Sequence, residues 1–175
     1  MPDVMAQHLE RLGLAGVNSV GLLGSTGSYA YLSPEERKRT VRVAADALGG
    51  RVPLIVGVGA LRTDEAEALA RDAVEAGANG LLLAPVSYQK PTEEEVYQHF
   101  KAVAAAGGLP LCIYNNPSTT NFIFSPDLIA RLSQVPHIAG VKMPLPGNGD
   151  FAGELANLRS RTPEGFVIGY SGDWG

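Results

Sequence analysis

One lysine stands in an otherwise apolar run near the carboxyl end of the sequence. Lys142 closes the segment Ile138-Ala139-Gly140-Val141-Lys142, whose alternation predicts a β-strand with Ile138, Gly140 and Lys142 on one face and Gly140 leaving space beside the lysine. Burial lowers the pKa of an amine and frees its lone pair to attack a ketone. The segment therefore fits an imine-forming lysine, and a solvated lysine at a strand end is the alternative.

Hydroxyl groups are concentrated after two other apolar runs. Gly24-Ser25-Thr26-Gly27-Ser28 could hold a carboxylate through backbone N–H groups and two hydroxyls, or could be only a turn that glycine permits. Tyr114 precedes Asn115-Asn116-Pro117, where its hydroxyl could carry protons between an intermediate and solvent, or could simply be solvated above a packed ring. Tyr88 lies in a predicted loop, where a surface or interface aromatic residue is the ordinary interpretation.

Other kinds of chemistry find little support. Asp150 and Asp173 do not make the carboxylate pair that glycoside hydrolysis requires. Cys112, in an apolar run, is interpreted as a buried core thiol. Gly57-x-Gly59 lacks the third glycine of a dinucleotide-binding turn. Three histidines have no metal-ligand spacing and are interpreted as surface or packing residues: His8, His99 and His137.

The elements that must position these groups alternate along the chain. Near-continuous Val, Ile and Leu runs are typical of parallel strands covered on both faces. They predict six strands, at residues 19–23, 53–58, 80–84, 110–114, 139–142 and 165–169. Helix starts with a capping residue or early acidic residues lie between them: Ser33-Pro34-Glu35-Glu36, Thr63-Asp64-Glu65, Thr92-Glu93-Glu94-Glu95 and Ser125-Pro126-Asp127.

This alternation of strands and helices admits two α/β architectures. One is an open doubly wound sheet, but no phosphate-binding glycine fingerprint follows the first predicted strand. The other is a (β/α)₈ TIM barrel, which has eight strands and about 250 residues. We therefore predict one partial barrel domain over residues 1–175, with about six βα units. In such a barrel the working residues cluster at the carboxyl ends of the strands, where Tyr114 and Lys142 are expected.

Composition and charge limit the partners. The formal net charge of −4, with 45% hydrophobic and 18% charged residues, is that of an ordinary globular protein and suggests neither a nucleic-acid nor a membrane partner. No stretch approaches the roughly 18 apolar residues of a membrane span, and the N-terminus has no signal-peptide pattern. A cytoplasmic protein is expected.

In order along the chain, these motifs resemble those of the dihydrodipicolinate synthase and N-acetylneuraminate lyase family of Schiff-base lyases. The resemblance covers essentially the whole chain and rests on Gly24-Ser25-Thr26-Gly27, Leu32-Ser33-Pro34-Glu35-Glu36-Arg37, residues 53–59 with Ala76-Gly77-Ala78, Tyr88, Pro91, Tyr97-Gln98-His99-Phe100, Ile113-Tyr114-Asn115-Asn116-Pro117 and Gly140-Val141-Lys142.

The resemblance implies a role for each candidate residue. Lys142 would form an imine with pyruvate or a related 2-oxo acid, and Tyr114 would relay protons to and from the adduct. Ser25 and Thr26 would hold the carboxylate, with Ser25 also in the relay. Tyr88 would complete the relay in a neighbouring subunit, because the family forms homodimers and often homotetramers. The resemblance implies no metal and no organic cofactor.

Departures from the family pattern alter the expected reaction. Ser28 takes the place of a glutamate, and Met143-Pro144 that of Glu-Ala. Thr119 stands where true dihydrodipicolinate synthases have an arginine for the second substrate, and losing such a bidentate group is not conservative. We therefore expect an aldolase or dehydratase that acts on another 2-oxo acid.

The family's first and eighth strands have no counterpart in the sequence. The resemblance therefore predicts a barrel without these two strands. The alternative to an enzyme is a catalytically inactive barrel fragment that serves as a binding or interaction module.

Overall fold

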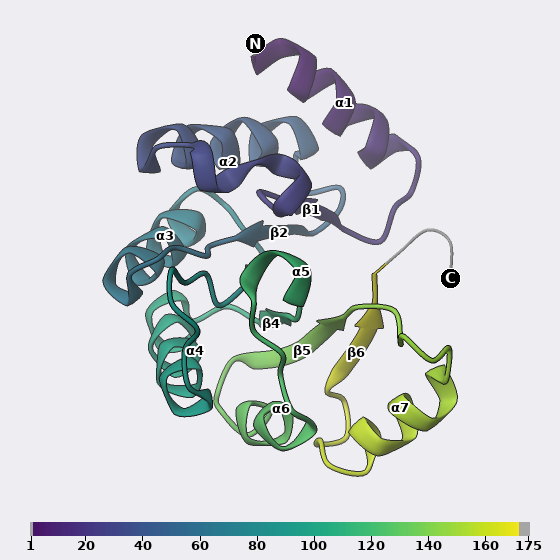
Figure 1. The fold of residues 1–175 in the computed structure, drawn as a ribbon. Coiled ribbons are helices and arrows are strands. Elements are labelled where there is room, and N and C mark those ends of the chain that lie inside the picture. Colours follow the sequence, from purple (N-terminus) through teal and green to yellow (C-terminus); the bar gives the residue numbers. More distant parts are fainter. Residues whose placement is uncertain (1, 172–175) are drawn as a thin grey trace.

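The computed structural model describes residues 2–171, in which helices and strands alternate (Figure 1). In chain order the elements are α1 (Pro2–Leu14), β1 (Val20–Leu22), η1 (Ser25–Gly27), η2 (Tyr29–Tyr31), α2 (Pro34–Leu48), β2 (Leu54–Gly57), α3 (Thr63–Glu75), β3 (Gly80–Leu83), α4 (Glu93–Gly107), β4 (Leu111–Tyr114), α5 (Pro117–Thr120), α6 (Pro126–Leu132), β5 (Ile138–Met143), α7 (Phe151–Arg159) and β6 (Val167–Tyr170), where η marks a 3₁₀-helix.

The six strands form one parallel sheet in the order β1-β2-β3-β4-β5-β6. Each strand pairs with the next along the chain, whereas a doubly wound sheet reverses its order at a switch point. The sheet curls with helices along its outer side (Figure 1). The predicted α/β fold, an incomplete (β/α)₈ barrel with six strands, is therefore confirmed, and β1 and β6 are the edge strands of the described residues.

The predicted strands and helix starts are present with small shifts at their ends. The largest shift is in β6, which was expected from residue 165 and begins at Val167. Helix α2 has a complete capping box: Ser33 Oγ accepts from the backbone N–H of Glu36 at 3.2 Å, and the Glu36 carboxylate accepts from the backbone N–H of Ser33 at 2.9 Å. Thr92 begins α4 in the same way, and the Ser125 side chain caps α6.

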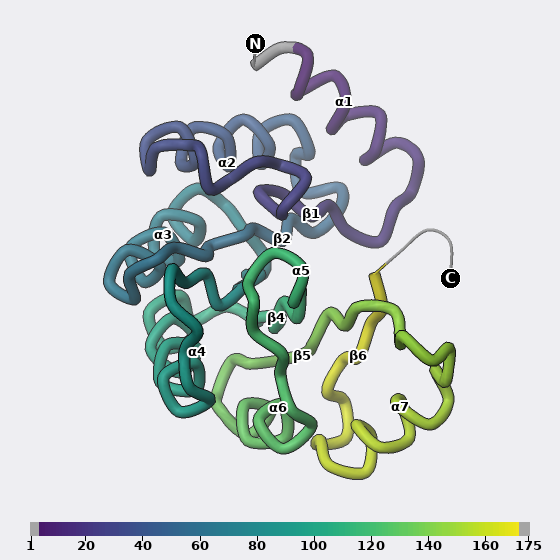
Figure 2. The backbone as a smooth tube through the Cα atoms, viewed as in Figure 1, coloured from purple at the N-terminus to yellow at the C-terminus, as the bar shows by residue number. Residues whose placement is uncertain are grey.

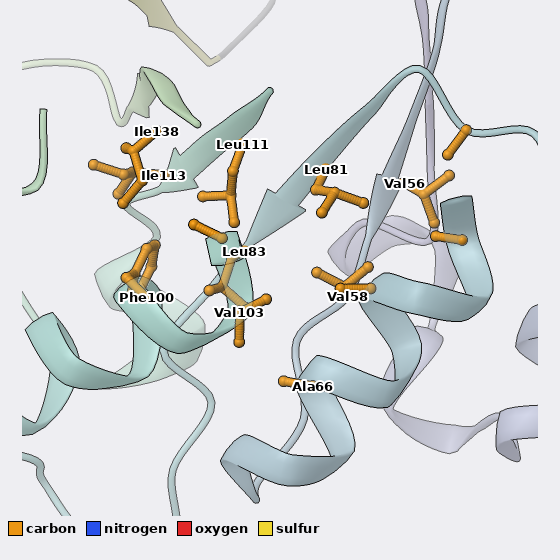
Figure 3. Close-up of a cluster of buried hydrophobic side chains, with 14 of the residues drawn as sticks. Val56, Val58, Ala66, Leu81, Leu83, Phe100, Val103, Leu111, Ile113 and Ile138 are labelled. Atoms are coloured by element: carbon orange, nitrogen blue, oxygen red, sulfur yellow. The ribbon is translucent and has the colours of Figure 1, made fainter. Parts of the chain in front are cut away.

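One face of the sheet packs against the helices and forms the core. Phe100 and Val103 of α4 are fully buried. Figure 3 shows them beside apolar side chains of β3, β4 and β5, namely Leu83, Leu111, Ile113 and Ile138. The periodicity of the strands therefore places one complete set of alternate residues under the helices.

The other face of the sheet, here called the inner face, carries the remaining alternate residues. The strand register places Leu82, Cys112 and Gly140 side by side on it, with Tyr114 and Lys142 further along. Leu82 and Cys112 are only half-buried, and Val167 of β6 is 63% exposed. The inner face is thus open in the described residues.

A β-bulge in β5 corrects the predicted alternation. Leu111 pairs with Ile138, but the next residue, Cys112, pairs with Gly140, so Ala139 is an additional residue in the ladder. Ile138 therefore lies on the helix-covered face with Leu111, while Gly140 and Lys142 lie on the inner face. The prediction of one shared face was wrong for Ile138, because period-two alternation assumes an uninterrupted ladder.

The absence of a side chain at Gly140 has a different cause from the one expected. A Cβ built there would lie 2.7 Å from the carbonyl oxygen and 2.9 Å from the Cβ of Val167. Glycine at this position therefore allows β6 to approach β5 and leaves no vacant volume beside Lys142.

No helix in residues 2–171 is long and apolar enough to cross a membrane.

Candidate active site

Lys142 and Tyr114 lie side by side on the inner face. They are register partners near the carboxyl ends of β5 and β4, and the ladder continues because the Asn115 N–H donates to the Lys142 carbonyl at 3.0 Å. The Lys142 Nζ lies 4.6 Å from the centroid of the Tyr114 ring, within the range of a cation–π contact. Both side chains are half-buried. The structure therefore brings together the amine and the phenol that were chosen from sequence.

The third hydroxyl comes from the turn after β1. Leu23, which is buried, has a φ of +57°, a left-handed conformation that is uncommon for a residue with a side chain. The chain then turns through the single 3₁₀ turn of η1. As a result the Ser25 Oγ lies 3.5 Å from the Tyr114 hydroxyl, although the two residues are 89 positions apart.

Gly57 makes this turn possible. The carbonyl oxygen of Leu23 approaches β2 so closely that a Cβ built on Gly57 would lie 2.0 Å from it. Only glycine accommodates such an approach of two backbones. The Gly57-x-Gly59 pattern, which carried little weight as a nucleotide motif, therefore has a structural role beside the candidate site.

Asn116 also belongs to this group, although it was not among the predicted site residues. Its Nδ2 donates to the Tyr114 hydroxyl at 3.1 Å and lies 3.4 Å from the Ser25 Oγ. Asn116 precedes α5, which lies at the carboxyl end of β4; Figure 2 shows the chain turning there before it runs to α6. A polar residue two positions beyond the end of a barrel strand is the signal that could have identified it.

Two predicted residues lie away from this group within the chain. Thr26 is exposed in η1, whereas its neighbour Ser25 is half-buried and reaches Tyr114. Tyr88 is 95% exposed in the loop between β3 and α4. Its assignment to the proton relay of a neighbouring subunit therefore stays a prediction.

A buried arginine supports the strand ends next to the site. Arg37 of α2 is 6% exposed and donates to the carbonyl oxygens of Gly57 at 2.9 Å and Gly59 at 3.0 Å. Its guanidinium carbon lies 5.2 Å from the centroid of the Tyr29 ring. Burial lowers the pKa of Arg37. Burial also raises the pKa of Tyr29; the charge of Arg37 opposes this rise, and Tyr114 adds to it. Tyr29 and Tyr114 line one small cavity with Gly59.

Cys112 lies on the inner face of the sheet and not in the helix-covered core, where it was expected. Leu111 and Ile113 occupy the core positions, because alternate residues of a strand point to opposite faces. Burial raises the pKa of the thiol to about 11, and Lys142 opposes this shift. Since the thiolate is the nucleophilic form, Cys112 is not activated as a nucleophile.

The remaining polar candidates have structural roles away from the site. The His99 Nδ1 lies 2.9 Å from Thr63 Oγ1 and so links α4 to α3. Asp150 caps α7 by accepting from the Gly153 N–H at 2.9 Å, and Asp173 lies outside the described residues. Between residues 2 and 171, no group of three or more His, Cys, Asp or Glu side chains is arranged to hold a metal ion.

Comparison with known sequences identifies close relatives. The model of the dihydrodipicolinate synthetase family matches residues 4–174. A 4-hydroxy-tetrahydrodipicolinate synthase from Salinibacter ruber is 40% identical over 159 residues, which are 90% of this chain and 51% of the relative. A synthase of the same name from Neisseria meningitidis serogroup C is 40% identical over 171 residues, with shares of 98% and 56%. The chain thus spans about half the length of the curated relatives it matches.

Solved structures give the same grouping. The crystal structure of dihydrodipicolinate synthase from Agrobacterium tumefaciens superposes with a TM-score of 0.97 and 57% identity, covering 99% of this chain and 58% of that one. A prophage protein of the dihydrodipicolinic acid synthase family from Escherichia coli K12, crystallised in complex with pyruvate, gives a TM-score of 0.87 and 29% identity, with coverage of 95% and 56%.

Proposed function

The chain belongs to the dihydrodipicolinate synthetase family, and we propose that it is a Schiff-base-forming lyase, an aldolase or dehydratase, that acts on pyruvate or a related 2-oxo acid. The observation that carries the proposal is the approach of the Lys142 Nζ to within 4.6 Å of the Tyr114 ring centroid. The complex of the prophage relative with pyruvate supports a 2-oxo acid as substrate.

The proposed reaction begins with Lys142. Its amine attacks the ketone carbon, the C=O π electrons move to oxygen, and that oxygen leaves as water after taking up protons. The resulting imine, once protonated, withdraws electrons from the neighbouring carbon, which can then lose a proton to give an enamine. The enamine carbon forms a bond to an aldehyde carbon in the direction of synthesis, and this bond breaks in the direction of cleavage.

The surrounding hydroxyls serve proton transfer and substrate binding in this proposal. Tyr114 donates protons to the adduct and accepts protons from it. Ser25, whose Oγ lies 3.5 Å from the Tyr114 hydroxyl, takes part in this transfer. Ser25 and the exposed Thr26 hold the substrate carboxylate at the η1 turn. Tyr88, which is at the surface, enters the site of a second subunit of a homodimer or homotetramer.

The second substrate distinguishes two candidate reactions. One candidate, raised by the family resemblance, is the condensation of pyruvate with aspartate semialdehyde, and the relatives are named 4-hydroxy-tetrahydrodipicolinate synthases. We propose that this condensation is poor here, because the Thr119 hydroxyl donates to the Asn116 carbonyl at 3.3 Å and offers no two-pronged cation for a carboxylate. A panel of aldehydes offered with pyruvate tests this, and efficient turnover of aspartate semialdehyde overturns it.

Borohydride trapping tests the imine. The 175-residue chain is incubated with pyruvate and borohydride, and the modified peptide is identified by mass spectrometry. We expect one reduced adduct on the peptide containing Lys142, its loss in Lys142→Gln and its retention in Lys101→Gln, which alters an exposed lysine of α4. A folded chain without adduct, or with the adduct elsewhere, contradicts the proposal and favours the alternative of a binding or interaction module.

A further inference from the structure

The side-chain amide nitrogen of Asn116 contacts the candidate relay and not the helix that the residue precedes. Asn116 occupies the N-cap position of α5, yet its side chain makes no capping hydrogen bond to that helix. Its Nδ2 instead contacts the Tyr114 hydroxyl and the Ser25 Oγ, at 3.1 and 3.4 Å. Local helix capping therefore does not account for an amide at this position.

The orientation of this amide is set from its other end. The Ser118 hydroxyl donates to the Asn116 Oδ1 at 2.7 Å, which leaves the NH₂ group to face Tyr114 and Ser25. The Asn116 carbonyl is held as well, because it accepts from the Thr120 hydroxyl at 3.0 Å and from the backbone N–H of the same residue at 3.1 Å. Thr120 is buried, so this end of the contact is anchored.

The chemical consequence concerns the direction of proton transfer. An amide NH₂ group has no acceptor, so the oxygens of Tyr114 and Ser25 must both accept from it. The proton of Tyr114 is then free to point elsewhere, and its oxygen keeps the amide donor after that proton has left. A fixed donor aimed at an oxygen that develops negative charge stabilises that charge.

We propose that Asn116 is a positioning residue, which holds the Tyr114 oxygen as a hydrogen-bond acceptor and so favours release of the Tyr114 proton. The inference rests on the proposed imine chemistry. It extends that chemistry to a residue that acts through Tyr114 and its partner Ser25 and not on the reacting carbon itself.

The test compares Asn116→Asp and Asn116→Leu with the original chain. Asn116→Asp keeps the shape and the acceptor for Ser118, but presents an anionic acceptor to Tyr114 in place of a donor. Asn116→Leu removes both functions. The matched control is Asn121→Asp, the same exchange at the exposed residue that directly follows α5. Circular dichroism and thermal melting establish that each variant is folded.

Two rates are measured over a series of pyruvate concentrations up to saturation: formation of the borohydride-trapped adduct, and exchange of the pyruvate methyl protons in D₂O. Loss of a hydrogen bond to a charged oxygen lowers a rate about tenfold to a hundredfold. We expect losses of this size in both Asn116 variants, with unchanged half-saturation and final adduct stoichiometry, and a change below about twofold in Asn121→Asp.

The outcomes separate the two proposals. If the original chain traps pyruvate and the folded Asn116 variants have the same rates, the role of Asn116 is overturned and the imine chemistry stands. Equal losses in Asn121→Asp also overturn it, because they indicate a general effect of altering this loop. Original chain that neither traps nor exchanges pyruvate overturns the proposed function, and the inference with it.

Discussion

Gly57→Ala is expected to disturb the fold and the candidate site together. The new Cβ would lie 2.0 Å from the Leu23 carbonyl oxygen and 2.8 Å from its carbonyl carbon, and ordinary contact begins near 3.4 Å. The two backbones must therefore separate by about 1.4 Å, and no side chain can move aside instead. Ser25 follows Leu23 by two residues and contacts Tyr114 at 3.5 Å, so the separation displaces it from the relay.

The expected magnitudes are substantial. Overpacking of this kind costs about 1–3 kcal/mol of unfolding free energy. Misplacement of a reacting group by about 1 Å can lower a rate a hundredfold. Urea denaturation measures the first quantity, and the rate of borohydride trapping of pyruvate measures the second.

Gly21→Ala is the matched control, since a Cβ at Gly21 of β1 meets nothing within 4 Å. We expect its unfolding free energy to stay within about 0.5 kcal/mol of the original chain. If Gly57→Ala and Gly21→Ala unfold at the same urea concentration, the close approach of Leu23 to Gly57 does not constrain the protein, and the reasoning fails.

Three further predictions concern stability and association. Phe100→Ala should lower the unfolding free energy by about 3–5 kcal/mol, because Phe100 is fully buried; an unchanged urea midpoint contradicts this. Burial lowers the pKa of His99, so below about pH 6.5 the unfolded chain binds more protons than the folded chain, and the free energy of unfolding decreases as the pH is lowered. We expect His99→Gln, but not His8→Gln, to flatten this pH dependence in thermal melts. Val167 is exposed on β6, an edge strand of the part of the chain that the structure describes, and should promote self-association of the 175-residue chain, which Val167→Lys should reduce; a monodisperse 18.4 kDa species in light scattering argues against this.

The elements of the fold were predictable because their signals are local. The apolar composition of residues 111–114 alone indicates the buried strand β4. The spacing of Ser33 and Glu36 forms a capping box that does not depend on the rest of the structure. The pairing of Tyr114 with Lys142 also follows from local facts, since each residue stands at the carboxyl end of a parallel strand. These signals require only the order of the elements.

The remaining features depend on contacts between distant segments. The close approach of the Leu23 carbonyl to β2 is possible only because Gly57, on that strand, lacks a side chain. From sequence, Arg37 is one charged residue of an amphipathic helix, and only the structure places the carbonyl groups of Gly57 and Gly59 beside it. From sequence, Asn116 is an ordinary turn residue, and only the structure places Ser25 of the η1 turn next to it. In each case the missing information is which distant segments of the chain lie side by side.

The bulge at Ala139 decides whether the candidate site exists at all. Ile138 is in register with Leu111, so an uninterrupted ladder would pair Ala139 with Cys112 and Val141 with Tyr114. Since a shift of one residue moves every later side chain to the opposite face, Lys142 would then point toward the helices and away from Tyr114. The extra residue restores the phase, and it pairs Lys142 with Tyr114 while Ile138 stays in the core. One irregular residue thus reconciles the packing of β5 with the position of its amine.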